Sequence, residues 1–329
     1  MLSLNKLRLM NGSHCRLYAV VNPEAALGKT RRLWPKLREQ LQDKIGPFPW
    51  DWTSAPMQAS TLVRSALHMG RDLIVSVGGD GTHNETVNGF FEDGRILNPR
   101  ATLAIVSCGS GGDLSRSLGV TTQITSALGT ILSRRERQVD VGRVKFTQVS
   151  GELSERFFLN IASLGLPALA CSLLSSQPRF LGGSGRFMLA TARALVTNRH
   201  EKVTLEIDGR ELPSQFVNTV AAANGQFFGG GMRVAPHAKI DDGLLDVVVI
   251  GPVGIMDFLR WGHRLYRGKH LSHPRIQYYR ARTIHAFSRA PVPVETDGET
   301  IGTLPVTFTV RPRAIRVLVP SEYPANNKR

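Results

Sequence analysis

The sequence predicts an α/β domain followed by a mainly β domain, from its length and from two successive patterns. Up to about Gln138, short apolar runs alternate with longer segments of helical periodicity, which is typical of a parallel α/β layer. After about Asp140, short strands of alternating apolar and polar residues are separated by frequent turns. Because 329 residues suffice for roughly two domains, we place a domain boundary near residue 140.

Three apolar runs in the first domain are predicted to be buried strands: Leu17–Val21, Asp72–Val77 and Leu103–Val106. A helix is predicted over Lys29–Leu41, where apolar residues recur at helical spacing. A second helix is expected after the middle strand, with Val87, Phe90 and Phe91 on one face. The repeated order of strand, turn and helix indicates a parallel sheet.

The second domain is predicted to contain short strands and two helical interruptions. Strands are expected over Val203–Ile207 and Leu244–Ile250, and Thr307–Val310 is expected to pair with Ala314–Val319. Helices are expected over Gly185–Asn198 and Gly254–Tyr266. This half of the chain is therefore mainly β.

The longest charge-free stretch, from Phe157 to Pro178, is interrupted by asparagine, glycine, proline and four serines. We interpret it as buried core rather than a membrane span, so that any membrane contact would be peripheral. The N-terminus lacks the continuous apolar region of a signal peptide. The three cysteines stand far apart and predict neither a zinc site nor a disulfide framework, which fits a reducing cytoplasm.

The chain is strongly basic, with 41 lysines and arginines against 26 aspartates and glutamates and a net charge of +15. This balance favours an anionic partner, which could be nucleic acid, an acidic membrane surface or a phosphorylated small molecule. An arginine-rich composition without a partner is the plain alternative.

A glycine-rich turn over Gly78–Glu85 lies between an apolar strand and an amphipathic helix. Its backbone amides suit a phosphate ligand, Asp80 could reach a phosphate-bound Mg²⁺, and Thr82 could bond a phosphate oxygen. Asn84 and Glu85 are expected to begin the following helix. The alternative is a tight turn that binds nothing.

A second glycine cluster, Gly109–Asp113, also follows an apolar strand. Two such turns at the ends of parallel strands would converge on one crevice. Neither known nucleotide motif fits: Pro23 stands where a P-loop needs its first glycine before Gly28, and Leu114 stands where a dinucleotide fingerprint needs its third.

Two carboxylate clusters and one basic segment mark the second domain. Asp241–Asp246 surrounds a glycine and suits an oxygen-ligated cation, or is an acidic turn. Glu295–Glu299 could supply a carboxylate that accepts a proton, or is a plain hairpin. The segment Trp261–Arg282 is dense in arginine, histidine and aromatic residues, and suits nucleic acid, a membrane surface or a solvated basic face.

Five motifs follow one another along the chain: Asn22-Pro23, Gly-Gly-Asp-Gly-Thr, Gly-Ser-Gly-Gly-Asp, Ala-Lys-Ile-Asp-Asp-Gly-Leu-Leu-Asp and a late Asp-Gly-Glu. Together, in this order, they resemble the diacylglycerol kinase catalytic family. The resemblance covers residues 16 to 320 and points to the bacterial soluble lipid kinases, relatives of sphingosine and ceramide kinases. It implies an NAD-kinase-like parallel α/β domain over residues 1–139 and a β-sandwich over 140–312. It further implies a nucleotide in the interdomain cleft and a tail, 313–329, that returns to the first domain.

The resemblance also implies roles for individual residues. Glu299 would accept the proton of the lipid hydroxyl, with Asp297 beside it and Asp80 organising the metal-nucleotide complex. A structural Mg²⁺ would be held by Asp242 through its carboxylate and by Lys239 and Leu244 through their carbonyls. The nucleotide would contact the following residues: Asn22, Thr53, Gly78, Gly79, Asp80, Gly81, Thr82, His83, Asn84, Glu85 and Ser110. The second turn departs from the family's Gly-Thr-Gly-Asn-Asp-Phe, since Gly112 and Leu114 replace the asparagine and the aromatic residue.

The leading hypothesis is therefore an ATP- and Mg²⁺-dependent lipid kinase that is cytoplasmic and peripherally bound to an anionic membrane. The lipid is left open among diacylglycerol, monoacylglycerol, phosphatidylglycerol and ceramide or a sphingoid base, and the oligomeric state is open, a homodimer included. The alternatives are a kinase of a soluble substrate, similar to NAD kinase, and a non-catalytic basic module that binds lipid or nucleic acid. Under the leading hypothesis no nucleic acid partner is expected.

Overall fold

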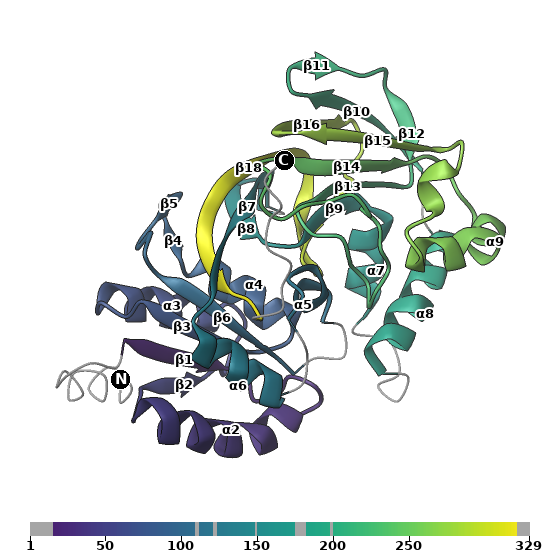
Figure 1. Cartoon of the computed structure of the whole chain (residues 1–329). Helices are drawn as coiled ribbons and strands as arrows, with labels where there is room; N and C mark the ends of the chain where they lie inside the picture. Colours follow the sequence, from purple (N-terminus) through teal and green to yellow (C-terminus); the bar gives the residue numbers. More distant parts are fainter. Residues whose placement is uncertain are drawn as a thin grey trace. The chain divides into compact units, whose positions relative to one another are not determined.

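The computed structural model describes residues 16–108, 112–120, 124–148, 150–174, 182–197 and 200–320. The chain divides into two compact units (Figure 1). The first unit runs to Val139 and resumes at Ala314, and the second spans Asp140–Arg313.

The first unit is built on a parallel sheet with the strand order β6-β3-β1-β2. Its strands are β1 (Leu17–Val21), β2 (Trp50–Trp52), β3 (Leu73–Gly78) and β6 (Thr102–Ser107). Its helices are α2 (Lys29–Ile45), α3 (Gln58–His68), α4 (Asp80–Asn88), α5 (Asp113–Ser117) and α6 (Ile124–Ser133). A small hairpin joins β4 (Phe91–Glu92) to β5 (Arg95–Ile96). The sequence prediction of a parallel α/β layer is confirmed.

The core of this unit forms where the sheet meets its helices. Every residue of β1 and β6 is buried, as expected for strands covered on both faces. Helix α2 adds Trp34, Leu37 and Leu41, which recur at the spacing of one helical face. The helix predicted over Lys29–Leu41 is therefore present and continues to Ile45.

The second unit is mainly antiparallel β structure. One path of its sheet runs β15-β14-β13-β9-β17-β18, and β18 continues through β16 to β10 and β12, while β7 pairs with β8 and β18. The strands are the following: β7 (Glu136–Thr147), β8 (Leu153–Phe158), β9 (Ile161–Gly165), β10 (Glu201–Ile207), β11 (Arg210–Glu211), β12 (Gln215–Val217), β13 (Thr219–Ala223), β14 (Leu245–Ile250), β15 (Ile276–Ala281), β16 (Thr283–Ser288), β17 (Pro293–Thr296) and β18 (Glu299–Leu318). Large apolar side chains such as Phe158 and Phe308 fill the space between these strands.

Three helices of the second unit gather beside its sheet (Figure 1): α7 (Leu166–Leu174), α8 (Gly182–Thr197) and α9 (Ile255–Tyr266). A single 3₁₀ turn, η2 (His270–Ser272), follows α9. The two helices predicted in this half correspond to α8 and α9, whereas α7 was not predicted.

The charge-free stretch is core, as predicted, over residues 157–168, whereas residues 171–174 are partly or fully exposed. It forms the end of β8, all of β9 and α7, and residues 157–168 are buried. Residues 175–178 of the stretch lie outside the described part. Within the described residues, none of the helices combines the length and the apolar character that a membrane crossing requires.

The hairpin predicted between Thr307–Val310 and Ala314–Val319 is wrong. Both runs, as far as Leu318, belong to β18, a single strand of 20 residues (Figure 1, yellow). Thr307 and Phe308 pair with β16 in the second unit, while Arg316 and Val317 pair in parallel with β6 in the first. The chain bends at Arg313, whose φ is 49°, instead of turning back.

The helix predicted after β3 is also different in extent. Helix α4 ends at Asn88, so Phe90 lies in a turn and Phe91 in β4. Both phenylalanines are buried, because the turn folds them onto the unit's interior. Their apolar spacing therefore reflected burial and not a shared helical face.

Candidate active site

The candidate site in the first unit begins at the carboxyl ends of neighbouring parallel strands. Asn22 follows β1, Thr53 follows β2 and the glycine turn follows β3, so all three lie at one edge of the sheet. The Asn22 amide Nδ2 donates a hydrogen bond to Thr82 Oγ1 at 3.0 Å. The Thr53 backbone N–H donates to the Val21 carbonyl at 2.9 Å. These contacts bring predicted nucleotide-binding residues together.

At Gly78 the turn requires glycine for space and not for an unusual backbone angle. Gly79 is extended (φ −99°), and neither Gly78 nor Gly81 has a positive φ. A Cβ on Gly78 would lie 2.5 Å from Thr82 Oγ1, so a side chain there would displace the threonine. Helix α4 begins at Asp80 directly after the turn. The amides of its first turn have no partner within the helix, which is the arrangement that receives phosphate groups.

The prediction that Asn84 and Glu85 begin this helix is wrong, because the helix begins four residues before Asn84. The Glu85 carboxylate instead accepts a hydrogen bond from the Ala59 N–H (3.1 Å) at the start of α3. Asn84 is buried within the helix, where its Oδ1 accepts a bond from Asn88 Nδ2 at 3.2 Å. Glu85 therefore links α4 to α3, whereas the Asn84 contact with Asn88 lies within α4.

His83 is fully buried below the same turn. Its Nδ1 lies 2.8 Å from Ser76 Oγ, and burial lowers the pKa of the imidazole to about 3. The ring is therefore neutral at physiological pH and joins α4 to β3. Because the His83 side chain is fully buried, only its backbone could contact a ligand at the turn.

The Asp80 carboxylate connects the two glycine turns. It accepts hydrogen bonds from the backbone N–H groups of Asp113 (3.2 Å) and Leu114 (3.3 Å) at the start of α5. Burial raises the pKa of Asp80, and the two amides act in the opposite direction. Gly112, with a φ of 61°, precedes α5 and allows this approach. Ser110, with Gly109 and Gly111, lies outside the described residues.

The candidate site in the second unit is the tight turn between β17 and β18. Asp297 and Gly298 have positive φ values of 46° and 93°, the backbone of a two-residue hairpin turn. The Asp297 carboxylate accepts three backbone N–H bonds, from Leu159 (3.2 Å), Asn160 (3.2 Å) and Ile161 (2.9 Å). Asp297 therefore orients the turn, which is a positioning role.

Glu299 follows this turn as the first residue of β18 and is partly exposed. Its Oε2 lies 3.9 Å from Arg156 Nη1. Its register partner across the hairpin is Thr296, which is buried. The carboxylate is thus held at the end of a rigid hairpin with a guanidinium beside it.

Glu295 lies beneath the turn and is almost fully buried. It accepts hydrogen bonds from the Gly298 N–H (2.9 Å) and from Ser163 Oγ in the neighbouring strand β9. Burial raises the pKa of this carboxyl to about 8, and the nearby Asp297 adds to the rise. Near neutral pH, a largely protonated acid therefore supports the turn. The sequence named Glu295 only as part of a carboxylate cluster, and nothing in it singled out Ser163.

An apolar pocket lies in the same unit and leaves about 820 Å³ free of atoms, including the part open to solvent. Its walls come from α7, α8, α9 and the strands beside them, and include Leu166, Phe187, Met232, Phe258 and Trp261. The sequence did not predict it, because its walls come from segments about 100 residues apart.

Helix α7 contacts both the pocket and the hairpin turn. Leu166, Pro167 and Ala170 line the pocket. The Ala168 carbonyl accepts a hydrogen bond from Thr300 Oγ1 at 3.1 Å, one residue after Glu299. One helix therefore connects an apolar pocket to a partly exposed carboxylate.

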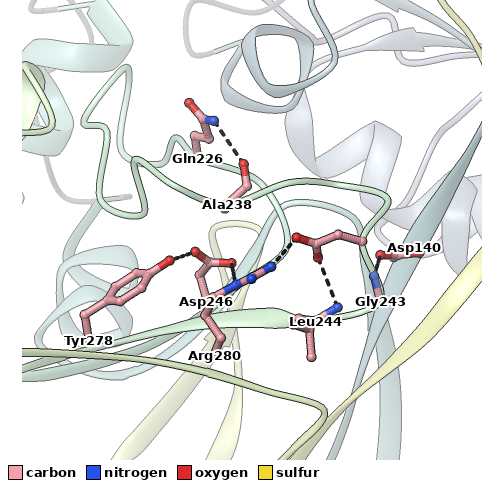
Figure 2. A network of polar contacts seen from close by, with 9 residues as sticks. Asp140, Gln226, Ala238, Gly243, Leu244, Asp246, Tyr278 and Arg280 are labelled. Carbon is pink, nitrogen blue, oxygen red and sulfur yellow. Dashed lines mark hydrogen bonds and ion pairs between the residues drawn. The ribbon is translucent and has the colours of Figure 1, made fainter. Parts of the chain in front are cut away.

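The predicted cation loop is held by contacts within the chain. Asp140 accepts backbone N–H bonds from Gly243 (2.6 Å) and Arg313 (2.7 Å). The buried Asp246 accepts a hydrogen bond from the Tyr278 hydroxyl and lies 3.9 Å from Arg280 Nε (Figure 2). Burial raises the pKa of Asp246 to about 7.

Asp242 is the predicted cation ligand, and both of its carboxylate oxygens have partners. Oδ1 accepts the Leu244 N–H at 3.2 Å, and Oδ2 is paired with the guanidinium of Arg280. Lys239 is exposed, and its charge partly offsets the effect of burial, which raises the pKa of Asp246. Within the described residues, histidine, cysteine and carboxylate side chains form no cluster of three suited to a metal ion. In this arrangement Arg280 occupies the Asp242 carboxylate that would bind Mg²⁺.

Comparisons with known proteins match both halves of the chain. A family model described as the diacylglycerol kinase catalytic domain matches residues 16–144, and one described as the YegS C-terminal NAD kinase beta sandwich-like domain matches residues 160–319. A diacylglycerol kinase from Bacillus subtilis is 28% identical over 315 residues, which cover 93% of this chain and 97% of the relative. One from Staphylococcus carnosus is 23% identical over 93% of this chain and 96% of the relative.

Solved structures give the same result at the level of the fold. A diacylglycerol kinase from Bacillus anthracis superposes with a TM-score of 0.69 at 25% identity, covering 93% of this chain and 97% of that one. An NAD kinase from Archaeoglobus fulgidus, solved in complex with ATP, has a TM-score of 0.50 at 14% identity over 93% and 94% of the two chains. The α/β domain followed by a β-sandwich, as predicted from the sequence, is confirmed.

Proposed function

Because the chain belongs to the diacylglycerol kinase catalytic family and is a kinase of a lipid alcohol, we propose that it transfers the γ-phosphate of ATP to the free hydroxyl of diacylglycerol. The ATP would bind as its Mg²⁺ complex. The phosphate transfer is proposed to take place at the cytoplasmic face of an anionic membrane, to which the protein binds peripherally.

The observation that carries this proposal is the double contact of α7. An acyl chain in the apolar pocket would lie against Leu166, Pro167 and Ala170, on the helix whose Ala168 carbonyl bonds Thr300. A glycerol hydroxyl at the mouth of the pocket would then lie toward the hairpin that carries Glu299. A soluble substrate similar to NAD would make no use of a pocket whose lining is almost entirely apolar.

The proposed chemistry assigns one reactant to each unit. The amides at the start of α4, with Asn22, Thr53 and Thr82 nearby, are proposed to bind the phosphates of ATP, while Asp80 holds α4 and α5 in register. When the lipid oxygen bonds to the γ-phosphorus, the bond to the β-phosphate oxygen breaks and ADP leaves. The hydroxyl proton passes to the Glu299 carboxylate, whose orientation depends on Asp297. Mg²⁺ bound to ATP would neutralise phosphate charge during this step.

The loop around Asp242 is proposed to have a structural role, separate from phosphate transfer. A cation held by Asp242 and the carbonyls of Lys239 and Leu244 would require Arg280 to release the Asp242 carboxylate. No step of phosphate transfer is assigned to this loop.

The proposal is tested by incubating the protein with labelled ATP, Mg²⁺ and a panel of diacylglycerol, monoacylglycerol, phosphatidylglycerol, ceramide, sphingosine and NAD. Diacylglycerol should be labelled fastest. The variant Glu299→Gln should lower kcat by about 10²-fold or more, as removal of a general base does, without a matching change in KM. Glu211→Gln, an exposed acid on β11, is the matched control.

Asp80→Asn should also lower activity, because its weaker bonds to the α5 amides disturb both turns. Transfer that is unaffected by both substitutions would remove the proposed site. Labelling of NAD, or of a different lipid in preference to diacylglycerol, would replace the proposed substrate.

A further inference from the structure

Helix α9 presents an apolar and basic face to solvent. Met256 is 74% exposed and Leu259 is 68% exposed, the largest exposures among the apolar side chains of this helix. Arg260 and Arg267 lie on the same side at helical spacing and are also exposed. No residue of α9 is buried, so the helix lies at the surface of the second unit.

The opposite side of α9 forms a wall of the apolar pocket. Phe258, Trp261 and Leu265 line the pocket at spacings of three and four residues. The pocket therefore lies directly beneath a helix whose other face is open to solvent. Within the second unit, α9 lies beside α8, which lines the same pocket (Figure 1).

The charge around α9 is one-sided. Residues 254–276 contain five lysines and arginines and a single acid, Asp257. Asp257 is already engaged, since its Oδ2 lies 3.2 Å from Arg275 Nη1 and accepts the Gly254 N–H at 3.1 Å. Among the ion pairs of the described residues, none involves Arg260, Arg264, Arg267 or Lys269. The exposed face thus carries positive charge available to an anionic partner.

We propose that the outer face of α9 binds the surface of a bilayer that contains anionic phospholipid. Met256 and Leu259 enter the boundary between head groups and acyl chains, and Arg260 and Arg267 bind the lipid phosphates. Trp261, with the Arg264 guanidinium 4.2 Å from its ring centre, lies between the bilayer and the pocket. An amphipathic helix of this charge suits a membrane better than nucleic acid, because exposed apolar side chains gain nothing from a phosphate backbone.

This inference deepens the proposed function and rests on it for its purpose, which is the delivery of a membrane lipid to the pocket under α9. The binding itself can be measured without catalysis. A failure of the docking surface and a failure of the kinase assignment are therefore separate results.

The test is sedimentation of the full chain with vesicles made of equal parts phosphatidylglycerol and phosphatidylcholine, without ATP. Two paired variants, Met256→Ser with Leu259→Ser and Arg260→Gln with Arg267→Gln, should each weaken binding by about tenfold or more. The matched controls remove the same chemistry elsewhere in the second unit: Leu153→Ser, at a side chain 85% exposed, and Arg210→Gln with Arg289→Gln. The controls should bind as the unchanged protein does, and thermal unfolding should be the same for all.

Four results decide the proposal. Binding that falls with added salt, that is lost on pure phosphatidylcholine vesicles and that depends on both α9 pairs supports it. Binding by the α9 variants equal to that of the controls overturns it. Self-association of the unchanged protein that the α9 variants abolish, with no vesicle binding, assigns the face to a second copy of the chain and also overturns it. Vesicle binding that persists in a protein without kinase activity leaves the docking surface standing and removes only the proposed function.

Discussion

Glu295 illustrates how a single buried acid supports the hairpin that carries Glu299. It contacts Gly298 and Ser163, and it lies beside the Asp297 carboxylate that bonds three backbone amides. Two ionised carboxylates this close together would repel each other, so a proton on Glu295 stabilises the turn. The family resemblance singled out Glu299 and Asp297, but the sequence could not predict the role of Glu295, because that role depends on burial and strand register.

The raised pKa of Glu295 predicts a pH dependence of stability. Between its ordinary value of 4.5 and about 8, the folded protein holds a proton that the unfolded chain has released. The free energy of unfolding should therefore fall as pH rises through this window. Glu295→Gln removes the titration and should flatten this part of the curve, measured by urea unfolding at a series of pH values. Equal slopes in the variant, the unchanged protein and the Glu211→Gln control would contradict the prediction.

At the scale of elements, the acidic loop that leads into β14 is contacted by an arginine side chain from the neighbouring strand β15. Arg280 on β15 pairs with Asp242 and approaches Asp246, which Tyr278 on the same strand also bonds. The spacing of the acids suggested an ion site, and the structure supplies a positive charge from a neighbouring strand. No sequence pattern could reveal this, because strand pairing across 30 or more residues decides which side chain reaches the loop.

Arg280→Gln should therefore make the protein respond to Mg²⁺. The variant should unfold at a lower temperature than the unchanged protein, since two acids lose their counter-charge, and added Mg²⁺ should restore part of the loss. The unchanged protein and the control Arg282→Gln should unfold at the same temperature with Mg²⁺ or with a chelator. A chelator that destabilises the unchanged protein would show that a cation, and not Arg280, holds Asp242.

At the scale of the whole molecule, β18 belongs to both units. Val317 pairs with β6, and Leu318 packs with Leu17, Trp34 and Ala104 in the core of the first unit. Leu318→Ala should lower the free energy of unfolding by about 2–5 kcal/mol, as for other buried leucines. Limited proteolysis should then cut first within residues 16–139, far from the substitution in sequence. Leu153→Ala, at an exposed site, should change neither measurement, and cleavage confined to the second unit would contradict the assignment.

Local patterns predicted the fold of the whole chain better than its site. Strands β1, β3, β6, β10 and β14 and helices α2, α8 and α9 follow from periodicity, because each buries one face or both. The continuous β18 was missed because Pro312 and two flanking arginines resemble a turn, while the bend at Arg313 is accommodated without reversing the chain. The apolar pocket, the Glu295–Ser163 contact and the role of Arg280 depend on tertiary neighbours and have no local signature.

The path of β18 also fixes the order in which the two units can be completed during synthesis. Residues 140–313 leave the ribosome before Ala314–Leu318. The second unit therefore has all its strands while the first unit still lacks the segment that pairs with β6. Until that segment is made, the edge of β6 is unpaired, and such edges are sites of wrong pairing. The part of the protein that is made first is the part that is finished last.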